Sequence, residues 1–281
     1  MPPAGIALGL LGAVSFGAGD VAGATVTKRS GALIAVAGAH LIGLVALIAA
    51  LFVLRPPPPN PGAVGIGVLA GFCGAAGLAA LYRGMALGSM GLVSALGGAG
   101  SLALPLVAGA LLGATIGPIQ LAGVIATAAA GAAASGATRS EIGRDGLLLA
   151  AIAAAALGAW YVLIDLAARA GDPTWAFVSS RTASAFAATA VSAFLVVGRG
   201  WRPGRLPFRL LGVAGCFDVG GNALYVASRG FIPVSLAAAL SGLYPIVTVL
   251  IARTVLGERL SWAARVGIGL ALLGVVLISF A

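Results

Sequence analysis

The sequence predicts an all-α, polytopic membrane protein with ten transmembrane helices arranged as two inverted five-helix repeats. The first observation is composition, because hydrophobic residues make up 60% of the chain and charged residues 8%, against roughly 45–50% and 25% in soluble domains. A water-soluble fold of 281 residues could not cover its surface with so few charges. The second observation is a series of long apolar segments, and the third is a pattern that recurs after 141–144 residues.

Each long apolar segment is expected to be a helix. About 20 apolar residues are needed to cross the hydrocarbon core, and the backbone there must satisfy its own hydrogen bonds. Ten segments meet this condition, at roughly 4–25, 31–54, 62–82, 87–112, 117–137, 146–168, 174–197, 208–228, 232–256 and 261–280. Residues that are costly in lipid separate many of them, namely Lys28 to Gly31, Arg55 to Pro61, Arg139 to Asp145, Gly171 to Pro173 and Arg199 to Arg209.

The internal repeat divides the chain into two halves, 1–140 and 141–281. Cys73, Gly77, Leu81 and Tyr82 recur 143 residues later as Cys216, Gly220, Leu224 and Tyr225. His40 and Arg181 occupy matching positions at a spacing of 141. Because each half holds an odd number of spans, the second half is predicted to be inverted relative to the first. Inverted halves are typical of transporters, in which the substrate site lies between the halves near the bilayer midplane.

The basic residues predict an orientation. The net charge is +9, and the chain has no nucleic-acid motif, so we expect the lipid bilayer rather than nucleic acid as the partner of these charges. Loops after odd-numbered spans hold ten Lys and Arg residues, and loops after even-numbered spans hold three. The positive-inside rule then places the odd loops in the cytoplasm and both termini outside.

Enzyme motifs are missing from the sequence. The chain has one His, and it has no His-Glu-x-x-His, no Cys pair at metal spacing, no Gly-x-Ser-x-Gly and no phosphate loop. Two cysteines within apolar stretches do not make a disulfide framework. We therefore predict a protein that is not an enzyme and needs no metal or cofactor.

Two prolines lie inside predicted spans. Pro105 falls within 87–112 and Pro245 within 232–256. Each removes a backbone hydrogen bond and can bend a helix. Because they lie in the corresponding span of each half, we predict bent helices that line a central cavity, with simple packing kinks as the alternative.

Ionisable residues at membrane depth are candidates for substrate binding or ion coupling. They are Asp20, His40, Arg181 and Asp218, and Asn222 lies one helical turn after Asp218. Asp20, His40 and Asp218 are the candidate proton carriers. Arg181 keeps its charge, so it needs a carboxylate, carbonyl groups, a substrate anion or water. A structural bridge to Asp218 and a substrate-binding role both fit.

Three aromatic residues complete the predicted site. Trp160 and Tyr161 lie in mid-span, and Tyr244 directly precedes Pro245. Such side chains could wall a cavity for an amphipathic solute, and packing in the core or against lipid is the alternative. Asp165 is expected to pair with Arg169, four residues further on, near the membrane surface.

The C-terminal part of the chain resembles a known family. Four stretches of sequence carry the resemblance, Asn222-Ala223-Leu224-Tyr225, Pro233-Val234-Ser235-Leu236, Leu243-Tyr244-Pro245-Ile246-Val247-Thr248 and Leu256-Gly257-Glu258-Arg259-Leu260. Together they resemble the second repeat of EamA-type transporters of the drug/metabolite transporter superfamily. The first half departs from this pattern, since Ala114 stands where the repeat places Glu258 and Pro105 is four residues out of register with Pro245.

The resemblance implies a ten-helix secondary transporter in the cell inner (plasma) membrane. The expected substrate is a small polar or amphipathic metabolite such as an amino acid, moved outward or by exchange. The resemblance also implies cytoplasmic termini, the reverse of the charge count, so the orientation stays open between the two. A passive channel-like facilitator and a non-transporting membrane interaction protein are the alternatives. No oligomeric state follows from the sequence.

Overall fold

The structure is a computed structural model and describes residues 2–111, 117–134, 142–228, 230–232, 237 and 240–279. Within these ranges the chain forms helices and contains no strand. The helices are α1 (Pro3–Ser30), α2 (Ala32–Leu54), α3 (Pro61–Leu87), α4 (Met90–Leu111), α5 (Pro118–Ala134), α6 (Arg144–Ala170), α7 (Pro173–Arg199), α8 (Phe208–Ser228), α10 (Tyr244–Thr254) and α11 (Trp262–Ser279).

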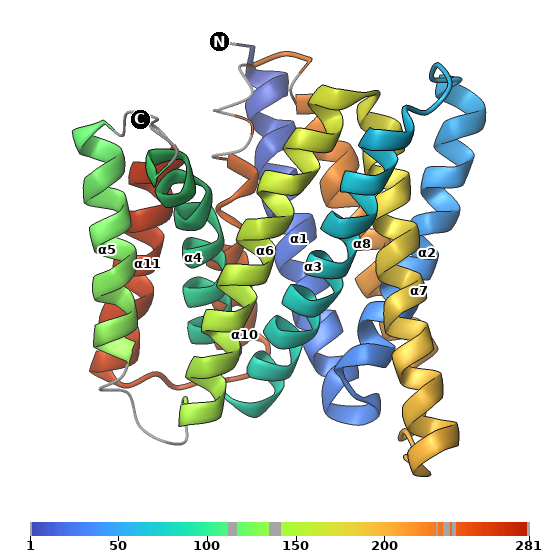
Figure 1. Cartoon of the computed structure of the whole chain (residues 1–281). Helices are drawn as coiled ribbons and strands as arrows, with labels where there is room; N and C mark the ends of the chain where they lie inside the picture. Colours follow the sequence, from blue (N-terminus) through green and yellow to red (C-terminus); the bar gives the residue numbers. More distant parts are fainter. Residues whose placement is uncertain are drawn as a thin grey trace.

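The helices form an upright bundle (Figure 1). Seven of those described, α1 to α4 and α6 to α8, are long and apolar enough to cross a membrane, and three apolar helices are shorter. The predicted all-helical membrane architecture is therefore confirmed, although fewer described helices reach spanning length than the ten predicted. The predicted span 232–256 lies partly outside the described residues, and its described helix, α10, begins only at Tyr244.

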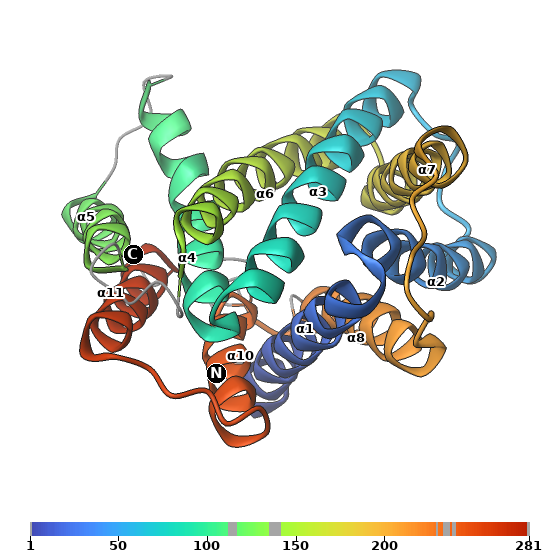
Figure 2. The same ribbon diagram turned by 90° about the horizontal axis from the view of Figure 1, so that it is seen from below.

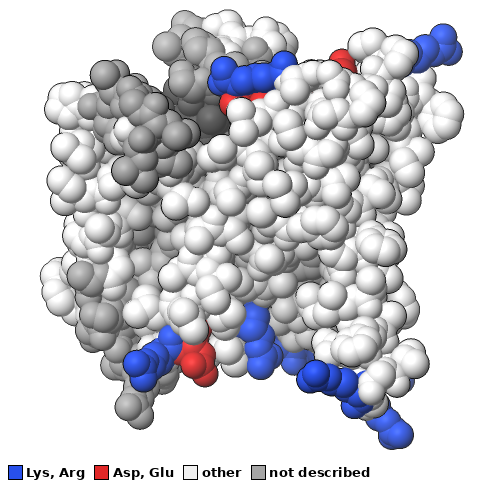
Figure 3. All heavy atoms as spheres, viewed as in Figure 1, with Lys and Arg blue, Asp and Glu red and all other residues white. Residues whose placement is uncertain are grey.

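Charged side chains gather at the two ends of the molecule, with a wide uncharged belt between them on the face that Figure 3 shows. The connections that follow α1, α3, α7 and α10 all lie at the lower end of the bundle in Figure 1. Lys28, Arg29, Arg199 and Arg259 are at or near these connections. These four of the basic residues counted in the loops after odd-numbered spans therefore lie on one side of the belt, as the positive-inside rule expects.

Helices from the two halves of the chain pack against each other throughout the bundle. Helix α1 packs on α8 and α6 packs on α3, while α2 crosses α7 and α5 lies along α11. Figure 2 shows α5 and α11 at one end of the bundle, α2, α7 and α8 at the other, and α1, α3 and α6 between them. Most of the interfaces that hold the molecule together therefore join one half to the other.

Local chemistry sets two of the helix starts. The side-chain oxygen of Asn60 accepts a hydrogen bond from the Gly62 amide at 2.9 Å, and Asp172 accepts one from the Thr174 amide at 2.7 Å. Proline follows each cap at the first helical position, where the missing N–H has no partner to lose. These caps explain why the segments around Pro61 and Pro173 end one span and begin the next.

The two mid-span prolines have different structural roles. Pro105 lies inside α4, as predicted, and in Figure 1 the upper end of α4 is seen nearly end-on while its lower part runs upright. Pro245 lies in the first turn of α10, so the prediction that it bends a continuous helix is wrong. Residues 242–243 form a turn, because a proline ring clashes with the carbonyl four residues earlier and a helix that reaches it ends and restarts.

Candidate functional site

Arg181 and Asp218 form an ion pair between α7 and α8. Nη1 of Arg181 lies 2.6 Å from Oδ2 of Asp218, and the two side chains are 10% and 18% exposed. That oxygen is shielded from solvent and has no aligned hydrogen-bond donor among the described residues. The contact is therefore an attraction between opposite charges at short range. Charged groups are costly inside a membrane protein unless they are paired.

His40 of α2 contacts α7 at about the depth of Arg181 along the helix. Its Nδ1 lies 2.5 Å from the hydroxyl oxygen of Ser184, and both residues are buried. His40 is eight residues into α2 and Arg181 is eight residues into α7, about 12 Å along each helix at 1.5 Å per residue. Both residues thus lie well inside their helices, away from the N-terminal ends.

Two equivalent contacts join α2 and α7, and they are related by exchange of the two halves. His40 faces Ser184, and Gly43 faces Arg181, since a Cβ at Gly43 would lie 3.7 Å from Cδ and Nε of Arg181. A shift of 141 residues carries 40 to 181 and 43 to 184, which is the spacing of the sequence repeat. The same pair of positions from each half therefore makes both contacts, and the glycine at 43 allows the close approach of Val219 on α8, because a Cβ there would lie 2.8 Å from Cγ2 of Val219.

Asp20 approaches the ion pair from α1. A Cβ at Gly19 would lie 3.4 Å from the backbone nitrogen of Asp218, and the Ser15 hydroxyl donates to the Phe217 carbonyl at 2.7 Å. This close packing of α1 on α8 brings the Asp20 carboxylate near enough to Asp218 for their charges to interact. Asp20 therefore lies near the carboxylate that pairs with Arg181.

Tyr244 lies between α1 and α4 at the start of α10. Its ring meets that of Phe16 edge-on, with centroids 6.3 Å apart. A Cβ at Gly98 would lie 2.7 Å from the Tyr244 hydroxyl, so the absence of a side chain there makes room for the phenol. Tyr244 is also within electrostatic range of Asp20, which places it on the same inner face as the carboxylates.

Two other predicted residues are occupied by local contacts. The Asn222 side-chain amide donates to the carbonyl of Asp218 on its own helix at 2.8 Å. The Trp160 indole N–H donates to the Ser180 hydroxyl at 3.1 Å, and its ring lies against Gly74 of α3. The structure therefore places Trp160 in the packing among α3, α6 and α7. Asp165 and Arg169 form the expected exposed pair, at 2.7 Å.

Tyr161 has a different setting from its neighbour Trp160. It lies within electrostatic range of Asp20 on α1 and Tyr225 on α8, so it faces other helices of the bundle. Nevertheless, 38% of its side chain is exposed. Tyr161 is therefore only partly covered by the other helices.

Two further residues belong to this region, and sequence reasoning missed the first of them, Ser184. Ser184 holds His40, and it could have been found by applying the 141-residue spacing to Gly43. Tyr82 is 1% exposed, its ring lies against Gly23 of α1, and it is close enough to Asp20 and Asp218 to interact with their charges. The sequence feature that points to Tyr82 is the Leu81-Tyr82 pair, which recurs as Leu224-Tyr225. Among the described residues, no cluster of three His, Cys, Asp or Glu could hold a metal ion.

Comparisons with known proteins place this fold. No curated protein matches the chain. A solved crystal structure of a protein is similar over 98% of this chain and 97% of its own, with a TM-score of 0.61 and 18% sequence identity, which speaks for the fold alone. A model of the EamA-like transporter family matches residues 3–134 and 144–280. The match covers nearly the whole chain, and the protein therefore belongs to the EamA-like transporter family.

Proposed function

We propose that the protein is a secondary transporter that exports or exchanges a small polar or amphipathic metabolite, with an amino acid as the best candidate. It would do so in the cell inner (plasma) membrane, by alternating access between the halves 1–140 and 141–281. The observation that carries the proposal is the Arg181–Asp218 pair with Asp20 beside it, inside the bundle. Charges at this depth are expensive and are kept where they have a task.

The arrangement of charges fits a zwitterion. A guanidinium binds a carboxylate well because its N–H groups match the two oxygens. The carboxylates of Asp20 and Asp218 suit an ammonium group in the same space. An amino acid carries both groups a short distance apart, so it could take the place of the Arg181–Asp218 contact without leaving a buried charge unpaired.

The aromatic residues near Asp20 also favour a substrate with an apolar side chain. Tyr161 and Tyr244 lie within electrostatic range of Asp20 and of each other, and Phe16 stands beside Tyr244. Binding sites commonly combine apolar and aromatic walls with a few polar groups that fix orientation. We propose that these rings contact the side chain of the substrate while the charged residues hold its backbone groups.

The packing of the two halves supports the mechanism. The contact of α1 with α8 corresponds to that of α6 with α3 under exchange of the halves, and α2 crosses its own counterpart α7. Such a relation favours two arrangements of similar energy, in which the contacts of one half replace those of the other. A substrate shifts this equilibrium only by binding one arrangement more tightly than the other. Asp20, His40 and Asp218 are the groups that could couple a proton to the exchange.

Counterflow in proteoliposomes tests the proposal. Purified protein is reconstituted, the vesicles are loaded with an unlabelled solute, and uptake of the labelled solute is followed for amino acids, nucleosides, sugars and organic cations. We expect saturable uptake that the internal solute accelerates for at least one amino acid, and no such uptake in liposomes without protein. Unsaturable flux would instead support a passive facilitator. The absence of flux for every class of solute tested would support a non-transporting membrane interaction protein.

A further inference from the structure

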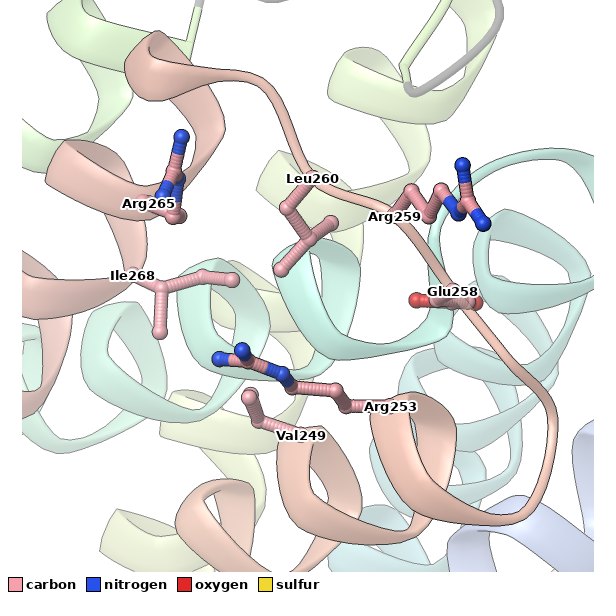
Figure 4. Close-up of a pocket in the computed structure, with 7 residues that line it drawn as sticks. All are labelled: Val249, Arg253, Glu258, Arg259, Leu260, Arg265 and Ile268. Carbon is pink, nitrogen blue, oxygen red and sulfur yellow. The ribbon is translucent and has the colours of Figure 1, made fainter.

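A second feature of the molecule lies apart from the Arg181–Asp218 pair. A cavity of about 310 Å³ opens where α10 connects to α11, and Figure 4 shows the side chains around it. Arg253 comes from the last turn of α10, Arg259 from the connection and Arg265 from the first turns of α11. Three arginines that are separate in the sequence therefore border one space.

Among the described residues, the positive charge of this cavity has no neutralising partner. Its one acidic residue, Glu258, is engaged elsewhere, because its carboxylate accepts hydrogen bonds from the Ser89 hydroxyl and the Met90 amide, both at 2.8 Å. The ion pairs within the described residues are Arg169–Asp165 and Arg181–Asp218. Three arginines against one glutamate leave two positive charges in excess.

The rest of the cavity is apolar. Val249, Leu260 and Ile268 line it beside the arginines, and Figure 4 shows Arg253 extending beneath Leu260. A free inorganic anion would gain nothing from these side chains. A ligand with an anionic group at one end and hydrocarbon at the other would contact both parts of the lining.

The depth of the cavity in the bilayer follows from Trp262. This residue begins α11, is 73% exposed, and its ring lies 5.7 Å from the guanidinium carbon of Arg265. Exposed tryptophans at helix ends mark the level of the lipid headgroups. The arginines beside it therefore lie at the height of lipid phosphates.

We propose that this cavity binds a phosphate group, carried by the headgroup of an anionic phospholipid whose chains extend over Val249, Leu260 and Ile268. Guanidinium groups bind phosphate oxygens through paired N–H donors, and basic pockets between transmembrane helices hold anionic headgroups. A lipid here would join α10 to α11. It would also act on α4, because Glu258 of the same connection holds the start of that helix.

Native mass spectrometry of the purified full-length protein tests this site. The protein in detergent is titrated with phosphatidylglycerol, with phosphatidylcholine and with sodium phosphate. The triple variant Arg253→Gln, Arg259→Gln, Arg265→Gln is compared with a matched control, Arg199→Gln, Arg202→Gln, Arg205→Gln, which removes as many charges outside the cavity. We expect phosphatidylglycerol to bind the wild type and the control, and its affinity for the cavity variant to fall roughly tenfold or more.

Three results would overturn the proposal. An equal loss in both triple variants would mean that surface charge alone attracts the lipid. Equal binding of phosphatidylcholine and phosphatidylglycerol would remove the role of the anionic headgroup. Saturable binding of sodium phosphate without phosphatidylglycerol would make the cavity a site for a free anion. If the cavity variant does not fold, Arg265→Gln alone serves, because that side chain is exposed and belongs to α11 rather than α10; the same loss of phosphatidylglycerol affinity relative to the control is expected.

Discussion

Arg181 is the residue whose position most needs an explanation in terms of function. Its charge cannot be removed by titration, and its pairing with Asp218 leaves Oδ2 of that residue without an aligned donor. A purely structural pair in a well-packed protein usually satisfies such groups, since a partly satisfied buried network is less stable than an apolar one. We propose that a substrate ammonium group or a proton competes with Arg181 for this carboxylate.

The contact between His40 and Ser184 gives a prediction about stability. Ser184→Ala removes the partner of a buried imidazole nitrogen, so we expect it to lower the free energy of unfolding by about 1–3 kcal/mol. The matched control is Ser192→Ala on the same helix. Ser192 is also buried, but its hydroxyl bonds only to the Ala188 carbonyl of its own helix.

Thermal melting of the purified variants in detergent measures the difference. The Ser184 variant should melt clearly below the wild type, and the Ser192 variant close to it. Equal melting temperatures for the two variants would show that the interhelical contact contributes nothing beyond the loss of a hydroxyl group.

The sequence alone identified much of this residue-level picture, but not all of it. Arg181 and Asp218 were predictable as a pair, because an intramembrane arginine needs an anion and the chain offers few. For Trp160 the sequence left cavity wall and core packing open, since the hydropathy of α6 does not reveal which of its faces meets Ser180. The neighbours of a side chain depend on how helices cross, and a single sequence carries little information about crossings.

At the scale of helices, glycines make the close crossings between the halves possible. A Cβ at Gly71 of α3 would meet the backbone carbonyl of Ser180 and lie 2.8 Å from Cβ of Ala183 on α7. A Cβ at Gly65, on the same helix, would meet nothing within 4 Å. In lipid such close approach replaces the hydrophobic force that drives packing in water.

These two glycines form a matched pair of tests. We expect Gly71→Ala to destabilise the protein by about 1–3 kcal/mol, because a backbone carbonyl cannot move aside as a flexible side chain can. Gly65→Ala should be neutral or stabilising by up to about 1 kcal/mol, since alanine favours the helix. Melting of both variants decides the matter, and an unaffected Gly71→Ala variant would contradict the packing described for α3 and α7.

The sequence predicted where helices form more reliably than where a helix is interrupted. The run 232–256 contains no charged residue before Arg253, so hydropathy predicts one span, and the structure instead starts α10 at Tyr244. Pro105 has the same chemistry and is tolerated inside α4. Whether a proline bends a helix or ends it depends on which neighbours satisfy the freed carbonyl, and that information lies in the packing.

At the scale of the whole molecule, the charge count predicts how the bundle sits in the membrane. A single cysteine at Arg202, with Cys73 and Cys216 replaced by serine, should resist an impermeant thiol reagent in intact cells and react after permeabilisation. A cysteine at Pro58, in the exposed connection at the opposite end, should react without permeabilisation. The reverse pattern would show that the termini are cytoplasmic, as the resemblance implies.

The central claim is that Arg181 and Asp218 hold the substrate between the two halves. Its most direct test is counterflow of labelled alanine and leucine by the wild type, by Arg181→Ala and by the double variant Arg181→Ala, Asp218→Ala, with melting temperature measured on the same samples. Removing one partner strands a buried charge and should cost about 3–5 kcal/mol of stability, whereas removing both should restore much of it. We predict that the double variant melts near the wild type and shows no saturable exchange. Wild-type exchange by the double variant would contradict the claim.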